Sequence, residues 1–376
     1  MRIGIDARSV LKKRTGVGTY TYNLIQNLSR LDRENRYVLF YSHHLNVRPY
    51  IPEIENPNFE NRFFRIPNKL LNLSWGTIKL PKIDWLVGKV DIYHSPNYNL
   101  NILARGKSVM TIHDLNFLAY RQFTISSGRW HYAFKIKNYA QKVDAIIADS
   151  FSTKNEIMKY LKIPEDKIHV IYLGCSQAFQ PLAADEKLRT TEEKFKIKGN
   201  FILYVGTLEP RKNLKGLIQA YAQTQAKNEF LLVLAGGKGW KYEHIFRLVE
   251  KLKLQDRVIF TGYVPEDDLP GLYKRASLFV YPSYYEGFGL PPLEAMACGL
   301  PVIVSNSTSL PEVVGDAGVY VDPYDIRQMS ATIDTVLSDS DLLETLRRRG
   351  PERAKLFSWE KTAIETLKLY QRLYGD

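Results

Sequence analysis

The sequence has few cysteines and no long apolar run, and each shortage excludes a class of protein. Only two cysteines occur among the 376 residues, Cys175 and Cys298, and they do not stand in a CxxC spacing. We therefore expect neither a disulfide framework nor a zinc site. No stretch of about 18 or more apolar residues is present, which predicts that no transmembrane helix exists. The opening MRIGIDARSV lacks the apolar core of a secretion signal, so a reducing cytosol is the expected location.

The first half of the chain is also short of acidic side chains. Residues 1–180 contain 26 lysines and arginines but 14 aspartates and glutamates, whereas residues 181–376 contain 26 of each. The whole excess of 12 positive charges therefore lies in the first half. That half is expected to meet something anionic, which could be a membrane surface, an anionic substrate or nucleic acid.

Short runs of valine, isoleucine and leucine recur along the chain and alternate with segments of helical length. Such alternation is typical of βαβ units with parallel sheets. The polar segment 177–200 interrupts the alternation and predicts a boundary between two doubly wound domains. Strands are expected over residues 2–6, 37–42, 91–95, 108–114, 145–150, 168–174, 201–206, 230–237, 257–262, 277–283 and 301–305.

The resulting fold class is α/β, with two Rossmann-like domains in tandem. We expect an N-terminal domain over residues 1–178 and a C-terminal domain over residues 195–357. The last segment, 358–376, is amphipathic and predicts a helix with Ser358 as its N-cap, packed back toward the N-terminal domain. Because ligands of such sheets bind beyond the carboxyl ends of the strands, the site is expected in the cleft between the domains.

The stretch YYEGFGLPPLEAMACG carries two glutamates eight positions apart, Glu286 and Glu294. Its glycines let backbone N–H groups approach a ligand, Pro291 and Pro292 suit a first helical turn, and Gly299 suits the helix end. A helix start after a strand is a ready anion site, and a carboxylate suits the vicinal diol of a sugar or ribose. The pattern therefore suggests a nucleotide-sugar site, although the spacing alone fits two solvated glutamates equally well.

EGFGLPPLEA resembles the E-x7-E motif of retaining glycosyltransferases with the GT-B fold, in particular glycosyltransferase family 4. The segments MACGLPVIVSN, SLPEVVGDAG and YVDP continue in the order of that family, so the resemblance covers nearly the whole chain. It implies that Glu286 contacts the hydroxyls of the donor sugar and that Glu294 contacts the ribose. The residues between the glutamates are implied to line the donor site, namely Gly287, Phe288, Gly289 and Leu290.

The segment YVGTLEPRKNLKGLIQAY predicts a strand, a turn and a helix start. Two adjacent cations, Arg211 and Lys212, lie in the turn, where they oppose the helix dipole unless an anion is bound. In the family this segment holds the donor diphosphate, and Lys212 matches the family lysine. The chain departs from the common pattern at Thr207, where an arginine usually stands, so Arg211 is the candidate to supply the guanidinium.

Two segments of the first half also match the family. RTGVGTY is a Gly-rich turn that is implied to face the diphosphate through Gly16 and Val17, although such turns often serve only tight packing. IHDL follows a predicted strand, and the resemblance implies that His113 is the active-site histidine near the donor sugar. A lone histidine is more often structural. Asp114 is expected to cap the turn, and His94 at another strand end is a weaker candidate.

GYVPEDDL follows a strand of the second half. In the family this loop covers the base through backbone contacts, which implies donor-binding roles for Gly262, Tyr263 and Val264. Asp267 and Asp268 are expected to cap the next helix.

The triplet DSD at residues 339–341 has the form of the DxD motif that binds a metal in other glycosyltransferases. Here it precedes LLETLRRRG and predicts a helix N-cap, so no metal is expected. A nicotinamide dehydrogenase would need a Gly-rich fingerprint with an acidic residue about 20 positions on, and the chain lacks that combination.

Two segments, 61–85 and 120–142, mix lysine and arginine with tryptophan, tyrosine and phenylalanine. That mixture suits a lipid headgroup surface. Aromatic core packing with a solvated basic face fits each segment equally well. Their shared location in the positive half favours a membrane-facing role for the domain that binds the acceptor in this family.

Together these patterns predict a GT-B hexosyltransferase without a metal cofactor, with Glu286 and His113 as catalytic residues. The resemblance implies retention of the anomeric configuration and a glycan or lipid-linked acceptor. TGVGTY, HDL and VGTLEPRKN are most similar to bacterial mannosyltransferases of polysaccharide, lipopolysaccharide and O-antigen assembly, which favours GDP-mannose as donor. UDP-glucose or another UDP-sugar is the alternative. A cytoplasmic enzyme, peripheral at the inner face of the cell membrane, is expected. A nucleic-acid or membrane-binding protein without activity would explain the charge but not the two-carboxylate site.

Overall fold

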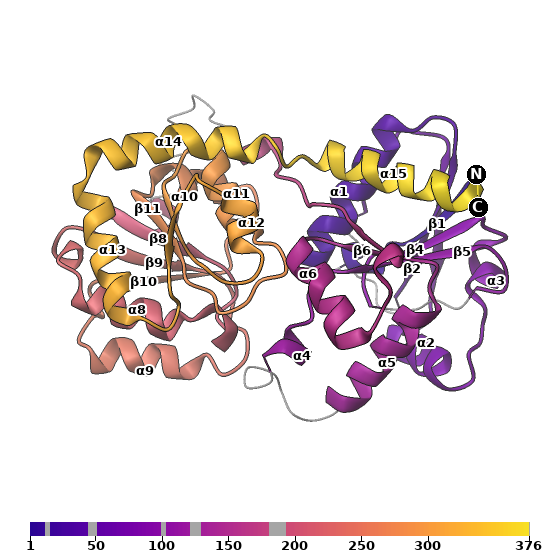
Figure 1. Ribbon diagram of the computed structural model, residues 1–376, viewed down its shortest axis with the longest axis horizontal. Coiled ribbons are helices and arrows are strands. Elements are labelled where there is room, and N and C mark those ends of the chain that lie inside the picture. The colour runs from indigo at the N-terminus through magenta and orange to yellow at the C-terminus, as the bar shows by residue number, and fades with distance from the viewer. Residues whose placement is uncertain (12–15, 44–50, 99–102, 121–128, 180–192, 376) are drawn as a thin grey trace. The chain divides into compact units, whose positions relative to one another are not determined.

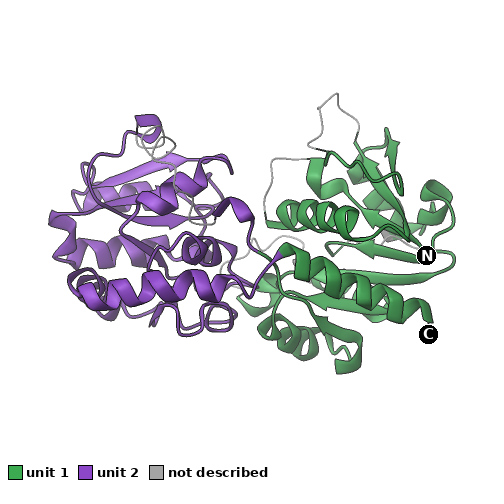
Figure 2. Ribbon diagram, turned by 90° about the horizontal axis from the view of Figure 1, so that it is seen from above, with its two compact units in different colours: residues 1–174, 359–376 green, residues 175–358 purple. Residues whose placement is uncertain are grey.

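The chain divides into two compact units in the computed structural model, which describes residues 1–11, 16–43, 51–98, 103–120, 129–179 and 193–375. Unit 1 consists of Met1–Gly174 and Trp359–Asp376, and unit 2 consists of Cys175–Ser358 (Figure 2). The division after Gly174 lies four residues before the expected end of the N-terminal domain, and the C-terminal helix is part of unit 1. Most of the polar boundary segment, residues 180–192, lies outside the described residues.

Unit 1 is built on a parallel sheet with the strand order β3-β2-β1-β4-β5-β6-β7. The order reverses between β1 and β4, which is the switch point where doubly wound sheets bind ligands. Its strands are β1 (Arg2–Asp6), β2 (Arg36–Ser42), β3 (Phe59–Phe64), β4 (Ile92–Ser95), β5 (Lys107–Ile112), β6 (Ala145–Ala148) and β7 (Ile168–Val170).

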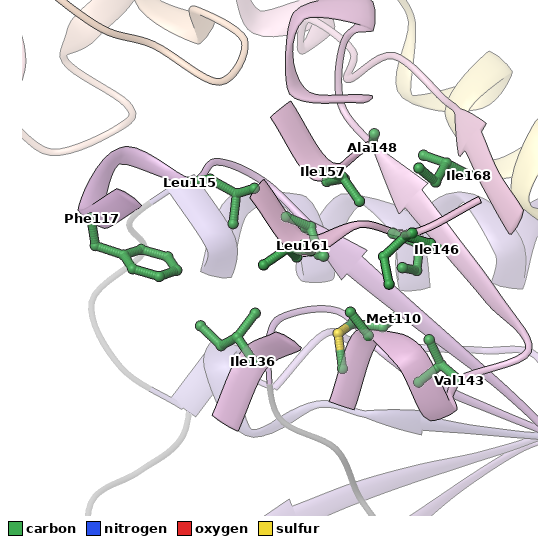
Figure 3. Packing of buried hydrophobic residues seen from close by; sticks show 13 residues of the cluster. Met110, Leu115, Phe117, Ile136, Val143, Ile146, Ala148, Ile157, Leu161 and Ile168 are labelled. Atoms are coloured by element: carbon green, nitrogen blue, oxygen red, sulfur yellow. The ribbon is translucent and has the colours of Figure 1, made fainter. Parts of the chain in front are cut away.

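Helices cover this sheet and close its core. Met110 and Ile146 of the strands pack against Ile136 of α5 in one apolar cluster (Figure 3). The last helix of the chain, α15, packs along α1 (Figure 1). The helices of unit 1 are η1 (Arg8–Leu11), α1 (Gly16–Leu31), α2 (Asn68–Thr77), α3 (Ile83–Val87), α4 (Asn116–Ala119), α5 (Arg129–Lys142), α6 (Phe151–Glu156), the π-helical η3 (Ile157–Leu161), η4 (Glu165–Lys167) and α15 (Trp359–Gly375).

Unit 2 repeats the architecture with the order β10-β9-β8-β11-β12-β13, again parallel. The order reverses between β8 and β11. Its central strands are buried almost throughout, as parallel strands covered on both faces are. The strands are β8 (Phe201–Val205), β9 (Leu231–Ala235), β10 (Val258–Gly262), β11 (Leu278–Tyr281), β12 (Val302–Ser305) and β13 (Val319–Val321).

The helices of unit 2 complete the βαβ alternation. Among them, α11 packs on α14, and α8 packs on α13. They are η5 (Gln177–Phe179), η6 (Pro210–Lys212), α8 (Leu214–Gln223), η7 (Ala226–Asn228), α9 (Glu243–Lys251), α10 (Leu269–Arg275), α11 (Leu290–Ala297), α12 (Leu310–Val314), α13 (Ile326–Ser338) and α14 (Ser340–Ala354).

The expected fold class is confirmed, with two differences in the strands. β3 was not expected, because its sequence FENRFF is mostly exposed and shows no apolar run. β13 was also missed, because it has only three residues. Most expected strands end earlier than expected, so His113 and Asp114 lie beyond β5 rather than within it. Within the described ranges, no helix is long and apolar enough to cross a bilayer.

Two of the expected aspartate caps of helices, Asp339 and Asp268, have different outcomes. Asp339 is the N-cap of α14, and its Oδ1 accepts a hydrogen bond from the backbone N–H of Leu342 at 2.9 Å, which confirms the interpretation of the DSD triplet. Asp268 occupies the N-cap position of α10, but its side chain makes no capping hydrogen bond. The carboxylate instead accepts from Nζ of Lys194 at 2.5 Å, so the capping prediction is wrong there.

Candidate active site

The loops after β8 and β11 form the switch point of unit 2. These strands are neighbours in the sheet, so their carboxyl ends deliver both loops to one place. The loop after β8 contains η6 with Arg211 and Lys212, and the loop after β11 contains Glu286. Two segments about 75 residues apart in the sequence thus meet where this type of sheet binds ligands.

Glu286 is held between the two cations. Its Oε1 accepts a hydrogen bond from Nζ of Lys212 at 2.7 Å, and its Oε2 accepts from Nη1 of Arg211 at 3.0 Å. Nζ of Lys212 also donates to the hydroxyl of Tyr281 at 2.6 Å. Burial alone would raise the pKa of Glu286, but Lys212 and Arg211 outweigh it and lower that pKa to about 2. Glu286 is therefore a carboxylate at every ordinary pH, with an orientation fixed by two ion pairs.

Arg211 has a second carboxylate partner that the sequence did not reveal. Its Nε donates to Oε1 of Glu209 at 2.9 Å, and its Nη1 also donates to the carbonyl of Tyr285 at 2.8 Å. Glu209 is buried. The guanidinium thus joins two carboxylates and a backbone carbonyl. Glu209 lies only two positions before Arg211, a spacing that does not bring side chains together on a helix.

Hydroxyl groups at the end of β12 and just after it fix the loop that carries Glu286. The backbone N–H of Glu286 donates to Oγ1 of Thr308 at 3.0 Å. Oγ of Ser309 donates to the carbonyls of Glu286 and Phe288, at 3.0 and 2.8 Å. Oγ of Ser305 donates to the carbonyl of Ser283 at 2.6 Å. In the sequence this support shows as the cluster of hydroxyl residues in SNSTS, residues 305–309, which the donor-site motifs do not include.

The start and end of α11 are formed as the sequence predicted. Gly289 precedes the helix with φ +113°, and a Cβ at this position would lie 2.7 Å from a methyl group of Leu310, so a larger side chain does not fit. Pro291 and Pro292 stand in the first turn. Gly299, at φ +74°, ends the helix with its N–H bonded to the carbonyl three residues before it.

Glu294 lies in the middle of α11 and has a different environment from Glu286. Its Oε2 accepts a hydrogen bond from the hydroxyl of Tyr273 at 2.9 Å. Burial raises the pKa of Glu294 to about 8, and the nearby charge of Glu266 adds to that rise. The pKa values of the two glutamates of one motif are thus shifted in opposite directions by their surroundings.

The other predicted donor residues of unit 2 are placed in two groups. Gly287, Phe288 and Leu290 continue the loop of Glu286 into α11, and Phe288 is buried. Gly262 ends β10 at φ +70°, followed by an exposed Tyr263 and a buried Val264. β9 separates β10 from β8, so this second group lies at the same edge of the sheet but apart from the ion pairs.

In unit 1, His113 follows β5 and is fixed on both edges of its ring. Nδ1 lies 2.7 Å from Oδ2 of Asp149, and Nε2 lies 3.0 Å from the carbonyl oxygen of Pro96. The imidazole is 14% exposed. Burial opposes the charged form, but Asp149 outweighs it and raises the pKa of His113 above its ordinary value. Asp149 stands near the end of the predicted strand 145–150, and no motif in the sequence marks it as a site residue.

The remaining candidates of unit 1 are mostly structural in their surroundings. Gly16 and Val17 are the first residues of α1, and the rest of the glycine turn, residues 12–15, lies outside the described residues. Oδ1 of Asp114 accepts from the N–H two residues on, as expected for a turn cap. His94 is fully buried, with Nδ1 2.6 Å from the hydroxyl of Tyr370, and burial lowers its pKa to about 3. His94 is therefore a neutral core histidine and no longer a site candidate.

Comparisons with known proteins assign both units. A family model described as Glycosyltransferase Family 4 matches residues 14–178, and one described as Glycosyl transferases group 1 matches residues 186–353. The chain is 34% identical to the O-antigen chain mannosyltransferase B of Escherichia coli, over 99% of this chain and 100% of that protein. It is 33% identical to the serotype-specific mannosyltransferase WbdA of Escherichia coli over 74% of this chain, but covers only 36% of WbdA.

The fold is shared with solved structures as well. Sucrose-phosphate synthase from Thermosynechococcus elongatus superposes with a TM-score of 0.79 at 23% identity, covering 100% of this chain and 99% of that one. At this identity the likeness shows the GT-B fold alone. The identity to mannosyltransferase B over the whole length, together with the two family models, shows more: the chain is a glycosyltransferase that belongs to the glycosyl transferases group 1, with an N-terminal domain of glycosyltransferase family 4.

Proposed function

We propose that the protein is a retaining mannosyltransferase that transfers mannose from GDP-mannose to a hydroxyl of a glycan or lipid-linked acceptor. The observation that carries the proposal is the 34% identity, end to end, to a protein named as an O-antigen chain mannosyltransferase. WbdA of Escherichia coli, which is also named as a mannosyltransferase, is similar over about three quarters of this chain. A UDP-sugar donor is not favoured by these relatives.

The ion pairs of unit 2 suggest how the site would act. Lys212 is the proposed ligand of the diphosphate, and its charge would stabilise the negative charge that the leaving GDP gains. We propose that it does so without a metal ion. Arg211 is engaged by Glu209 and Glu286, so its proposed share in the donor site is to hold Glu286 in place.

The proposed role of Glu286 is to bind the sugar hydroxyls and not to attack the sugar. Both carboxylate oxygens are engaged by cations, and the pKa of about 2 makes the group a weak nucleophile. We therefore infer that the acceptor attacks on the face from which GDP leaves, which retains the anomeric configuration. His113, with its raised pKa, is the proposed second contact to the sugar.

A membrane-facing role for unit 1 is supported by its exposed apolar side chains. The predicted basic aromatic segment 61–85 forms β3, α2 and α3, and it exposes Ile78 by 68% and Trp85 by 64%. Leu70 and Leu73 of α2 are exposed too. Lysines stand between these side chains, which is the pattern of a surface that rests on anionic lipid. The second segment, 120–142, lies largely outside the residues whose side chains are described.

Thermal melting with a nucleotide panel tests the donor. A ligand present at about 100 times its dissociation constant adds about 2.7 kcal/mol to the free energy of unfolding, which is readily seen as a melting shift. We expect GDP and GDP-mannose to raise the melting temperature and UDP, UDP-glucose and ADP to leave it unchanged. A shift with UDP species alone would overturn the GDP-mannose proposal.

Proton NMR of the product tests the stereochemistry. GDP-mannose carries an α-linked mannose, so a retaining enzyme must form an α-mannoside. A β-mannoside would overturn the retaining mechanism while leaving the donor assignment intact.

A further inference from the structure

The buried pair of His113 and Asp149 follows from the register of two strands. β5 pairs with β6 so that Ile112 lies opposite Ala148. His113 follows Ile112, and Asp149 follows Ala148. The two residues therefore leave the sheet side by side, at the carboxyl edge where doubly wound sheets bind ligands. Although 36 positions separate His113 and Asp149 in the sequence, their side chains meet at 2.7 Å.

The hydrogen bonds of His113 determine where its protons are. The carbonyl of Pro96 can only accept a hydrogen bond, so Nε2 of His113 must carry a hydrogen. Nδ1 faces a carboxylate oxygen, which favours a second hydrogen on the ring and hence the imidazolium form. Tyr20 packs edge-on against the ring at 4.9 Å, and its hydroxyl is bonded to Thr111 at 3.1 Å. The imidazole is thus fixed in both orientation and charge.

The stability of the fold does not account for this pair. Asp149 is 1% exposed, and among the described residues its Oδ1 has no hydrogen-bond partner. An unsatisfied buried oxygen is a cost, and apolar residues of similar volume often replace a buried ion pair without loss of stability. A charged pair that is costly to the fold, located at the ligand-binding edge, is the arrangement expected of a functional site.

We propose that Asp149 is a positioning residue for His113 and holds its imidazole as a fixed cation at the carboxyl edge of the unit 1 sheet. The proposal rests on the proposed function, because it needs His113 to contact the donor sugar. In that role the imidazolium, whose two N–H groups are engaged by Asp149 and Pro96, acts through its fixed positive charge, which favours the negative charge that the leaving diphosphate gains. The other described titratable groups around His113 are Asp114 beside it, Tyr20 from α1 and His94 from β4.

The test replaces Asp149 by asparagine, which keeps the shape and removes the charge. In the full chain with 15N-labelled histidine, the signal of His113 is assigned by its loss in His113→Gln and followed through a pH titration. In Asp149→Asn we expect the His113 midpoint to fall by about 1 pH unit or more. For transfer from GDP-mannose, kcat should fall by about 10- to 100-fold because the ring is no longer held as a cation, while KM changes little.

Asp32→Asn is the matched control. Asp32 is buried in the same unit and accepts hydrogen bonds from Tyr37 and Asn35, but it precedes β2 and so lies at the opposite edge of the sheet. The Asp32→Asn substitution should lower the melting temperature and leave both the titration midpoint of His113 and kcat unchanged.

Three outcomes would overturn the proposal. One is an unchanged His113 midpoint in folded Asp149→Asn, and another is a shifted midpoint with an unchanged kcat. The third applies even if the variant fails to fold, namely a wild-type His113 midpoint at or below about 6.5, the ordinary histidine value. A wild-type protein that does not use GDP-mannose would refute the donor instead, and the titration would then decide the role of Asp149 alone.

Discussion

The carboxyl edges of the two sheets are built in different ways on the same architecture. In unit 2 four charged side chains form a connected cluster, in which Lys212 and Arg211 are balanced by Glu286 and Glu209. At the corresponding edge of unit 1 the described charges form two separate ion pairs, Arg8 with Asp6 at the end of β1, and His113 with Asp149 beyond β5 and β6. The same architecture thus carries a connected, multiply charged cluster at one carboxyl edge and separate ion pairs at the other.

The difference shows that ligand affinity and orientation need different surroundings. A diphosphate is bound by several cations. Cations that lie close together repel one another, so carboxylates must balance their charge when no diphosphate is bound. One oriented group needs only one partner and a rigid frame around it. We therefore expect variants of unit 2 to change donor binding as well as the chemistry, and variants around His113 to change mainly the chemistry.

The largest effect is expected from Glu286→Gln, which keeps the shape of the side chain but removes its charge. Lys212 and Arg211 would lose the carboxylate that orients them. The hydroxyls of the donor sugar would lose the negatively charged group that accepts their hydrogen bonds. We expect kcat/KM to fall by about 100- to 1,000-fold, measured by transfer from GDP-mannose, with the circular dichroism spectrum unchanged. Glu250→Gln, an exposed position on α9, is the control. Full activity of Glu286→Gln would remove Glu286 from the site.

Lys212→Ala should act on donor binding more than Arg211→Ala does. A hydrogen bond to a charged group contributes about 1.5–3 kcal/mol, so the Kd for GDP should rise by roughly 10- to 100-fold in Lys212→Ala. Arg211 is already engaged by Glu209 and Tyr285, so its removal should weaken GDP binding less. Calorimetric titration with GDP compares the two. The reverse order would make Arg211 the main diphosphate ligand and the replacement for the arginine absent at Thr207.

The two glutamates of the motif should give opposite pH dependences of stability. The pKa of Glu294 is raised to about 8, so its contribution to stability is fully present below its unfolded pKa and is lost as pH rises through about 8. Glu286 has a lowered pKa of about 2, so its contribution is present above its unfolded pKa and is lost only in strong acid.

Melting curves at several pH values check the sign for Glu294. Between about pH 5 and pH 9, the wild-type melting temperature should fall by more than that of Glu294→Gln, because the variant has no carboxyl to ionise. Parallel curves for the two proteins would mean that Glu294 titrates normally in the folded state.

The charged cluster of unit 2 could be predicted because its parts lie in two short segments. Glu286 is part of a Gly- and Pro-rich motif, and Arg211 and Lys212 follow a readable strand, so a parallel sheet has to deliver them to one edge. The sequence did not show that β8 and β11 are direct neighbours, because strand order depends on how the helices pack. It also did not show Glu209, whose pairing with Arg211 depends on the turn geometry of η6.

Of the His113–Asp149 pair in unit 1, only His113 could be predicted from the sequence. His113 was found because it follows a readable strand and matches the family. Asp149 depends on the register between β5 and β6, and one residue of slip would turn its side chain to the other face of the sheet. β3 escaped for a related reason, since an exposed edge strand needs no apolar pattern. Long-range register and edge strands are therefore what the sequence left open here.

The smallest effect on catalysis is expected at the apolar surface of α2 and α3, where the two units differ in charge. Ile78→Ser and Trp85→Ser each remove an exposed apolar side chain, and each should weaken binding to vesicles of phosphatidylglycerol and phosphatidylcholine by about tenfold. Leu356→Ser, at a position in unit 2 that is 52% exposed, should change nothing. With a water-soluble acceptor, kcat should stay at the wild-type value, because these residues lie outside the proposed donor site.

The salt dependence of vesicle binding separates the charge of unit 1 from its apolar side chains. The excess of 12 positive charges acts through screened attraction, so binding of the wild-type protein should weaken strongly as salt is raised. The Ile78 and Trp85 variants should keep that salt dependence at a lower affinity, because they lose apolar contact and no charge. Sedimentation with vesicles at low and high salt measures both the electrostatic and the apolar contribution to binding. If the wild-type protein does not bind at low salt, where the attraction is strongest, the positive half has another partner, and the anionic donor or acceptor is the next to test.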